Sequence, residues 1–342
     1  MPNTTAVRTA QVGAAPFFAG KNKIINGDFN VNQRNFTSTT TDQAYGFDRF
    51  LLQNSGGCTY SAQTFTPGTA PVAGYEGKNF ARLVTAGQTA AGTYSVLTQK
   101  IESVRTFAGE TATVSFWAKA ATGTPKVAFE VIQTFGSGGS TAVSSVVGTV
   151  TLSTSWARYS FTKAIPSISG KTVGTSDCLT INLWVSAGTD FAGVGTGIQS
   201  NTFDFWGVQI EAGSTATAFQ TATGTIQGEL AACQRYYYRA VADTAYGSVA
   251  PYAVAASSSG FISMIQPPVT MRVSPTSIDF STLAFVNYAD TLYAASSLTL
   301  PANNNKQVIL VSGSMTGATA GHAGRLTGNN STAAYLGFSA EL

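Results

Sequence analysis

Two segments place a tryptophan on the polar side of an alternating pattern, and the first is residues 111–119 (TATVSFWAK). Val114 and Phe116 fall on one side of this pattern, while Trp117 and Lys119 fall on the other. An exposed indole ring gives a sugar ring a surface to stack on, and an ammonium group donates hydrogen bonds to hydroxyls. This pair therefore favours recognition of a polyhydroxylated ligand.

Residues 179–186 (LTINLWVS) repeat the pattern and place Asn182 and Trp184 on the side opposite the aliphatic residues. Glu130, in the alternating run 127–133, adds a hydrogen-bond acceptor. These positions predict a carbohydrate-binding surface, with the candidate residues Trp117, Lys119, Glu130, Asn182 and Trp184. A second interpretation stays open: either tryptophan packs beneath a loop, between domains or at a subunit contact.

Catalytic chemistry has little support, and the sequence predicts no catalytic residue. The one histidine, His322, lies in a run of small residues (GHAG) without a neighbouring Ser or Asp motif. Neither GxSxG nor HExxH occurs, and the acidic residues show no spacing typical of a glycosidase pair. Cys58, Cys178 and Cys233 are far apart and form no CxxC pair, which argues against a disulfide framework or a zinc site.

Charged residues are sparse along the 342-residue chain. The 19 Lys plus Arg and 16 Asp plus Glu give a formal charge of +3, and charged residues are 10% of the total. Soluble domains usually have about 25%, so a charge-rich coiled coil is excluded, and nucleic acid is not expected as a partner. No stretch approaches the roughly 18 apolar residues of a membrane helix, so no membrane insertion is expected.

The tryptophan segments belong to a longer series of short alternating runs separated by Gly, Thr, Ser and Pro. Further strand candidates are residues 127–135, 146–152, 156–162, 202–210, 260–265 and 307–311. No long amphipathic helical pattern lies between the early runs, which disfavours a parallel sheet built from βαβ units. The pattern predicts an all-β fold with a β-sandwich or barrel.

A change in composition divides the chain. Residues 213–228 (GSTATAFQTATGTIQG) have little to bury and predict a linker, and residues 229–238 (ELAACQRYYY) are the best helix candidate. We therefore predict four regions: an N-terminal arm or tether at 1–22, a sandwich at 23–213, a linker and short helix at 214–240, and a smaller C-terminal β-domain at 241–342.

An aromatic cluster follows the linker and comprises Arg235, Tyr236, Tyr237 and Tyr238. Tyrosine and arginine are favoured anchors at protein interfaces because they are large and carry a polar end. Three copies meeting there would bury surface that a C-terminal domain of about 100 residues cannot easily bury alone. The cluster therefore predicts an oligomer interface, with a ligand patch as the alternative.

Several motifs in order along the chain resemble those of phage tail fibre proteins. They are KIINGDFNVNQR at 23–34, YGFDRF at 45–50, VSFWAKA at 114–120, SWARYSF at 155–161, WGVQIEAG at 206–213 and ELAACQRYYYR at 229–239. The runs PPVTMRVSPT at 267–276 and GFSAEL at 337–342 resemble the C-terminal domain of that group. The resemblance implies an N-terminal jelly-roll like that of carbohydrate-binding modules and a homotrimeric virion protein.

On this resemblance we expect a non-enzymatic tail fibre or host-recognition protein, assembled in the host cytoplasm and located in the virion tail. Its expected partners are other copies of itself, a host cell-surface polysaccharide, and a tail or baseplate protein reached through the N-terminal region. A capsid or baseplate decoration with the jelly-roll as a spacer is the alternative. A polysaccharide-degrading tailspike is a further alternative.

The resemblance also raises the question of calcium, because many carbohydrate-binding jelly-rolls hold this ion near an early NG-(D/G)-F strand. Asn26 to Phe29 supply that strand here, but Trp206 and Gly207 stand where the pattern has aspartates. Asp28 and Asp204 are weak calcium candidates, since calcium prefers six to eight oxygen ligands. The expectation is no cofactor, with Asp28 capping a turn.

Overall fold

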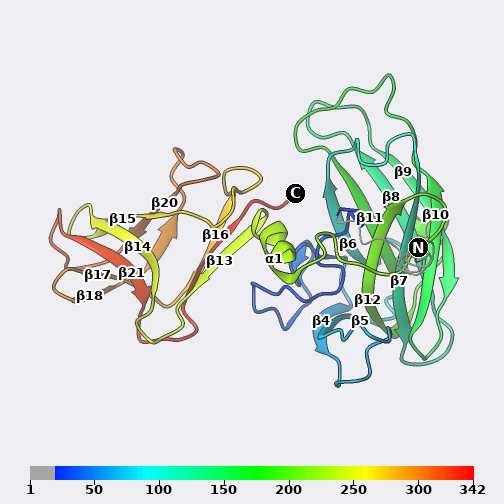
Figure 1. Cartoon of the computed structure of the whole chain (residues 1–342), viewed down its shortest axis with the longest axis horizontal. Coiled ribbons are helices and arrows are strands. Elements are labelled where there is room, and N and C mark those ends of the chain that lie inside the picture. Colours follow the sequence, from blue (N-terminus) through cyan, green and yellow to red (C-terminus); the bar gives the residue numbers. More distant parts are fainter. Residues whose placement is uncertain (1–19) are drawn as a thin grey trace, which may run out of the picture.

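The computed structural model describes residues 20–342, so the predicted arm at 1–22 lies almost wholly outside the described residues. The fold is nearly all β, as the sequence predicts, and comprises an N-terminal sandwich and a C-terminal domain (Figure 1). Within residues 20–342, neither helix has the length and hydrophobicity that crossing a membrane requires.

The first sheet of the sandwich has six antiparallel strands. In spatial order they are β1 (Ser38–Thr39), β4 (Cys58–Thr64), β5 (Asn79–Ala86), β12 (Ser200–Ala212), β7 (Thr111–Ala120) and β10 (Ala157–Ala164). Strand β7 is the first tryptophan segment, and its partners are β12 and β10.

The second sheet also has six antiparallel strands. In spatial order they are β2 (Ala44–Tyr45), β3 (Leu51–Asn54), β6 (Tyr94–Glu102), β11 (Cys178–Ala187), β8 (Lys126–Thr134) and β9 (Val143–Thr151). Strand β11 is the second tryptophan segment, and a 3₁₀ helix, η1 (Thr189–Val194), follows it directly. The two tryptophan segments therefore lie in different sheets.

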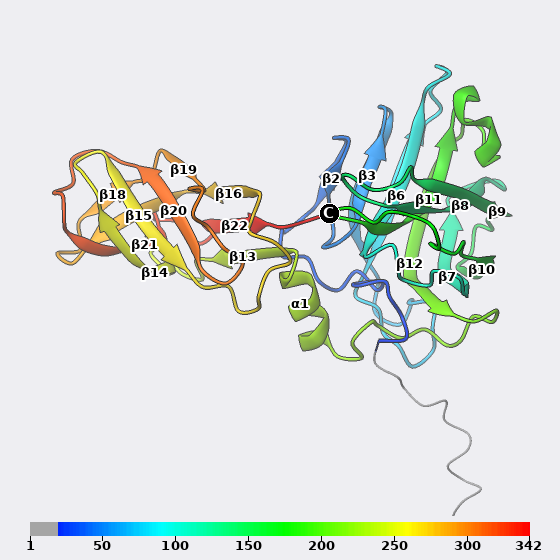
Figure 2. The ribbon, with the colours of Figure 1, turned by 90° about the horizontal axis from the view of Figure 1, so that it is seen from above.

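The core of the sandwich lies between the two sheets (Figure 2). Val114 and Phe116 of β7 meet Leu179, Ile181 and Leu183 of β11 there, and all five side chains are buried. The predicted division of each strand into a core side and an outer side is thus confirmed for these residues. Below, the outer face of a sheet means the side away from this core.

The predicted linker and helix differ from the structure. Residues 213–228 are not a free connection, because Phe219 packs in the core cluster of the sandwich and Ala222 is buried as well. The helix α1 spans Ile226–Gln234, three residues earlier than predicted, because the Thr225 side chain caps it by accepting from the Gly228 N–H. Of the three tyrosines that the sequence places at the helix end, Tyr237 and Tyr238 begin a strand instead.

The C-terminal domain contains two sheets. The smaller has the order β13 (Tyr237–Val241), β22 (Tyr335–Ser339) and β16 (Ser277–Ser281). The larger has the order β18 (Leu292–Ala294), β17 (Leu283–Asn287), β21 (Ala323–Gly328), β14 (Ser248–Ala255), β15 (Gly260–Ile265), β20 (Ile309–Ser314) and β19 (Ser297–Thr299).

The C-terminal end of the chain lies between the two domains, beside the second sheet (Figures 1 and 2). Glu341 pairs with Arg49, which is 1% exposed, and lies 3.4 Å from Arg34. The Leu342 carbonyl accepts hydrogen bonds from Tyr45 and from Lys100. Buried ion pairs and hydrogen bonds, rather than a flexible linker alone, therefore join the domains.

Candidate functional site

Glu130 is the centre of a hydrogen-bonded network on the outer face of the second sheet. Its Oε2 accepts from the Asn182 amide at 2.9 Å and from the Trp184 indole at 2.8 Å. Its Oε1 accepts from the Ser144 hydroxyl at 2.5 Å, and Thr98 donates to Asn182 at 2.7 Å. These five residues, here called the Glu130 network, come from the adjacent strands β6, β11, β8 and β9.

The register of the sheet brings these residues together. Asn182 pairs directly with Glu130 across β11 and β8, and with Thr98 across β11 and β6. Directly opposed residues of antiparallel strands lie on the same face, so complementary polar groups there can bond across the sheet. Three of the five predicted site residues, Glu130, Asn182 and Trp184, thus meet, while sequence reasoning missed Thr98 and Ser144.

An aromatic cluster adjoins the Glu130 network and partly corrects the prediction for Trp184. The Trp184 ring lies 5.5 Å from that of Phe191 in η1 and 6.4 Å from that of Tyr94 in β6. Trp184 is only 8% exposed, because Val194 and these rings pack against it. The half-buried rings of Tyr94 and Phe191 are therefore the ones more accessible to a ligand, and Trp184 supports them.

Strand β6 shows how this outer face is arranged from end to end. Its outward residues are, in order, Tyr94, Val96, Thr98, Lys100 and Glu102. Val96 packs in the aromatic cluster, Thr98 belongs to the Glu130 network, and Lys100 donates to the Leu342 carbonyl. The Glu130 network therefore lies between an aromatic cluster at one end and the docked C-terminal residues at the other.

Trp117 and Lys119 do not join this site, because β7 places them on the outer face of the first sheet. Lys119 lies 3.7 Å from Asp204 and faces the ring of Trp156. The predicted set of five residues is therefore divided between the two outer faces of the sandwich. This separation corrects the single surface that the sequence predicts.

Trp117 is half-buried and packs in an aromatic layer beneath the linker. Its ring lies 5.6 Å from that of Trp206 and 6.3 Å from that of Phe219, and the Arg158 guanidinium covers it at 4.7 Å. Gly207 makes this packing possible: its φ is +64°, and a Cβ there would lie 2.8 Å from the Trp117 ring. The open alternative for Trp117, packing beneath a loop, is the one that the structure supports.

Residues 235–238 make their contacts within a single chain, so their aromatic side chains do not need a second copy of the chain to be buried. Tyr236 and Tyr237 are 3% and 2% exposed. Arg235 and Tyr236 bond to Glu102 of β6, and the Arg34 guanidinium stacks on Tyr237 at 3.6 Å. The residues predicted as an oligomer interface are thus largely used in the contact between the two domains, which corrects that assignment.

The two calcium candidates have separate partners. Arg82 holds Asp204 through two hydrogen bonds of 2.6 and 2.9 Å. Asp28 accepts from Tyr75 and from the Asn30 amide, both at 2.6 Å. Among residues 20–342, no group of three or more His, Cys, Asp or Glu side chains is placed to hold a metal ion.

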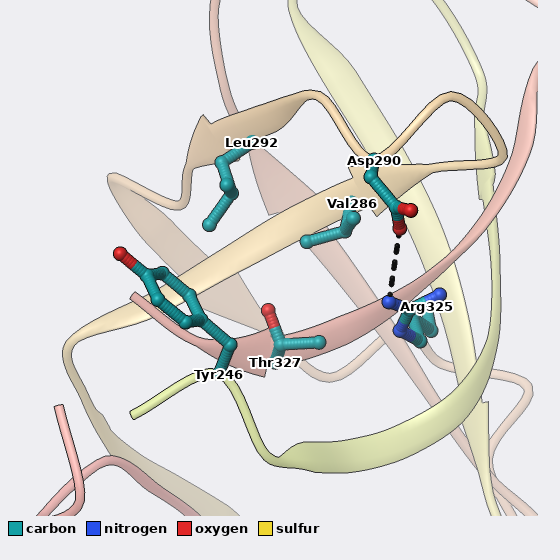
Figure 3. Close-up of a pocket in the computed structure, with 6 residues that line it drawn as sticks. All are labelled: Tyr246, Val286, Asp290, Leu292, Arg325 and Thr327. Carbon is teal, nitrogen blue, oxygen red and sulfur yellow. Dashed lines mark hydrogen bonds and ion pairs between the residues drawn. The ribbon is translucent and has the colours of Figure 1, made fainter. Parts of the chain in front are cut away.

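The larger sheet of the C-terminal domain carries a shallow pocket of about 360 Å³ on its outer face (Figure 3). Tyr246, Val286, Leu292 and Thr327 line it together with an ion pair between Asp290 and Arg325, 3.2 Å apart. The Asp290 side chain is 80% exposed. Exposed ion pairs contribute little free energy, and nothing in this pocket indicates a particular chemistry.

Comparison with protein-family models and with curated protein sequences found no match. Comparison with solved structures found similarity at low TM-score to structures that include carbohydrate-binding modules and a phage tailspike domain. A structure described as "CBM4 structure and function" has a TM-score of 0.33 and 19% identity, covering 55% of this chain and 98% of its own.

Two further structures have the same TM-score of 0.33. The CBM22-1 xylan-binding domain of Xyn10C from Paenibacillus barcinonensis is 12% identical, and the match covers 59% of this chain and all of that one. The enzymatically active domain of tailspike protein 4 from bacteriophage CBA120 is 14% identical, and the match covers 56% of this chain and 21% of that one.

Proposed function

We propose that this chain is a non-enzymatic glycan-binding protein and that the glycan lies against the outer face of the second sheet. The Glu130 network is the observation that carries the proposal. A carboxylate held by three donors on neighbouring strands is fixed in position before a ligand arrives, which lowers the entropy lost on binding. Thr98 orients Asn182 in the same way, by donating to its side-chain oxygen.

The neighbouring groups complete a surface suited to a sugar. Tyr94 and Phe191 offer half-buried aromatic rings to the apolar face of a pyranose, and Ser144, the exposed member of the Glu130 network, can bond a hydroxyl. Lys100 stands on the same face toward the C-terminal residues. An extended glycan running along β6 would meet these features in turn.

Binding is favoured over hydrolysis by the state of the carboxyl groups on this face. Most glycosidases need two carboxyl groups roughly 5–10 Å apart, one of them free to transfer a proton. Both oxygens of Glu130 already accept hydrogen bonds, and Glu102 is held by Arg235 and Tyr236. Neither carboxyl is poised as a general acid.

The biological role that we infer is host recognition by a virion tail fibre. The support is the order of the sequence motifs, which resemble those of phage tail fibre proteins. In this role a host cell-surface polysaccharide is the ligand, and the N-terminal region joins a tail or baseplate protein. A decoration protein with the sandwich as a spacer is the competing role, and it requires no glycan binding.

Self-association into a trimer belongs to the same proposal, through a different surface from the one that the sequence suggested. The outer face of β14 and β15 carries Tyr252, Val254, Ile262 and Met264, which are 64, 40, 42 and 39% exposed. Tyr252 pairs with Met264 and Val254 with Ile262, so the four form one apolar block without a charge. A second copy of the chain can cover such a neutral, self-compatible block.

Linking three weak sugar sites would raise the apparent affinity by roughly 10²–10⁴ where all three can bind together. Light scattering tests the assembly: a trimer has three times the 35.4 kDa of one chain. A clean monomer at micromolar concentration would refute it, and Ile262→Ser should shift the trimer toward the monomer.

Binding to purified host-surface polysaccharide tests the function. We expect the intact chain to bind and to release no new reducing ends. Release of reducing ends would support the tailspike alternative. Absence of binding by a correctly folded, assembled chain would support the decoration alternative.

A further inference from the structure

A second cavity lies beside the first sheet, and none of the residues that line it belongs to the Glu130 network. Its volume is about 320 Å³, near the lower limit for ligand pockets. Three segments form it: the turn that carries Asp28 and Asn30, the loop ending at Tyr75, and residues 218–229, which include Phe219. None of the roles assigned above uses this cavity.

Two of the residues that line the cavity carry a buried oxygen that accepts no hydrogen bond. Asp28 is 2% exposed, and its Oδ2 accepts from Tyr75 and Asn30. Its Oδ1 is buried and has no partner, and the same is true of Oδ1 of Asn30. Buried polar groups are nearly always hydrogen-bonded, so two unpaired acceptors on residues that line one cavity indicate a missing donor.

The charge of the lining residues indicates what kind of donor fits. Asp28 and Glu229 are acidic, and no Lys, Arg or His is among the residues that line this cavity in the described chain. Glu229 is already satisfied by the N–H of Asn26 and by the N–H and hydroxyl of Thr223. Burial raises the pKa of Asp28, as expected for a carboxylate that lacks a nearby cation.

Two aromatic rings line the same cavity, and one of them, that of Tyr75, carries the hydroxyl that bonds to Asp28. The rings of Tyr75 and Phe219 lie 5.5 Å apart, and each packs on Trp206, at 5.4 and 5.1 Å. Aromatic faces attract cations. Trp206 is fully buried, so the two rings rest on a fixed base.

We propose that this cavity binds the primary ammonium group of a small ligand of hexosamine size, with Asp28 as the counter-ion. An ammonium group has three donors and no acceptor, which matches two unpaired acceptors and a surplus of negative charge. A neutral hydroxyl brings a single proton and leaves the charge uncompensated. The site is separate from the proposed glycan face and does not depend on it.

Three matched sugars test the proposal with the full chain. Glucosamine carries the ammonium group, N-acetylglucosamine replaces it by an amide, and glucose by a hydroxyl. Calorimetry or ligand-observed NMR should detect glucosamine binding at least tenfold tighter than that of the other two. Equal affinity for all three would overturn the proposal, as would displacement of glucosamine by calcium at an equal or lower concentration.

Asp28→Asn tests the counter-ion, because it keeps the shape of the side chain and removes the charge. We expect at least a tenfold loss of glucosamine affinity, while Asp290→Asn, which removes an exposed acid in the C-terminal domain, should bind as the unchanged chain does. Phe219→Leu is a second variant in case Asp28→Asn does not fold, and it should weaken binding severalfold. Undiminished binding in a folded Asp28→Asn or Phe219→Leu chain would overturn the proposal.

Discussion

The two outer faces of the N-terminal sandwich differ in structure, although the tryptophan segments that form part of them have similar sequence patterns. On the first sheet, Trp117 belongs to an aromatic layer with Trp206, which residues 213–222 cover through Phe219. On the second sheet, Trp184 donates to Glu130 and leaves a polar network on its face. The first outer face is closed by aromatic packing. The second carries a hydrogen-bonded network that is also largely buried, with Glu130 6% and Asn182 2% exposed, beside the half-buried rings of Tyr94 and Phe191.

This comparison shows that a side chain that points away from the core is not for that reason accessible to a ligand. A tryptophan on an outer face can still be covered by a segment that is remote in sequence. The use of each face depends on what docks on it: the linker on the first sheet, and η1 and the C-terminal residues on the second.

The largest effect that we expect is on stability, from Trp206→Ala in the covered face. The side chain is fully buried among Phe65, Tyr75 and Phe219, so its removal leaves a cavity. The cost should be about 3–5 kcal/mol in denaturant unfolding. The matched control is Val84→Ala on the same outer face, which is 39% exposed and should change stability by less than about 0.5 kcal/mol. Similar losses for both would mean that the layer is not packed as described.

The next largest effect should follow from Glu341→Gln at the domain contact. This change leaves the buried Arg49 guanidinium without a counter-charge, although the backbone carbonyl of Lys100 and the ring of Tyr236 still contact it. We expect a loss of about 1–3 kcal/mol. Calorimetric unfolding of the variant should show the two domains melting more independently. Glu110→Gln, at an exposed position, is the control, and equal behaviour of the two variants would contradict the ion-pair contact.

The sequence predicts where several strands lie and which side of each strand faces the core. It predicts much less about which strands pair with one another. In residues 111–119 and 179–186 the period of two fixes which side chains point away from the core, and the structure agrees. It does not fix which strands pair, because β7 joins β12 and β10, and β11 joins β6 and β8, from distant parts of the chain. The alternating pattern alone therefore predicts one surface for Trp117 and Trp184.

Other errors have a similar origin. Phe219, one aromatic residue in a run of Thr, Ala and Gly, was the available sign that the linker packs on the sandwich. Tyr94 and Thr98 belong to an alternating segment, but only the pairing of β6 with β11 places them beside Asn182 and Trp184. The tyrosines at 236–238 are of a type favoured at interfaces, but Tyr236 bonds to Glu102 and Tyr237 lies under Arg34 of the same chain.

A smaller effect should separate the two tryptophans that the sequence treated alike. Trp184→Phe keeps an aromatic ring and removes the indole donor to Glu130, which should cost about 1 kcal/mol of stability and weaken glycan binding severalfold. Trp117→Phe makes the same change on the covered face and should leave glycan binding unchanged. Thermal unfolding and polysaccharide binding measure both, and weaker binding by the Trp117 variant would contradict the division of faces.

The smallest effect concerns acid stability at the domain contact. Burial opposes ionisation of Glu102, but hydrogen bonds and charge from Arg235, together with Tyr236, hold its pKa below the ordinary value. Such a group stabilises the fold above its unfolded pKa, and this contribution is lost as the pH falls through the lower folded value. Both side chains are about 40% exposed, so the contribution is at most about 1 kcal/mol.

Glu102→Gln removes this pH dependence. The melting temperatures of the variant and the unchanged chain should differ most near neutral pH and converge as the pH falls below about 4. A difference that stays constant over this range would show that Glu102 does not act through its charge.

The proposed glycan face is tested most directly by a pair of buried acids, one on each outer face. Glu130→Gln replaces an acceptor in the network on the second sheet, and Asp204→Asn does the same beside Arg82 on the first. The binding of each folded variant to host-surface polysaccharide is the measurement. The account predicts at least a tenfold loss of affinity for Glu130→Gln and no loss for Asp204→Asn. Equal binding by the two variants, or a loss confined to Asp204→Asn, would contradict it.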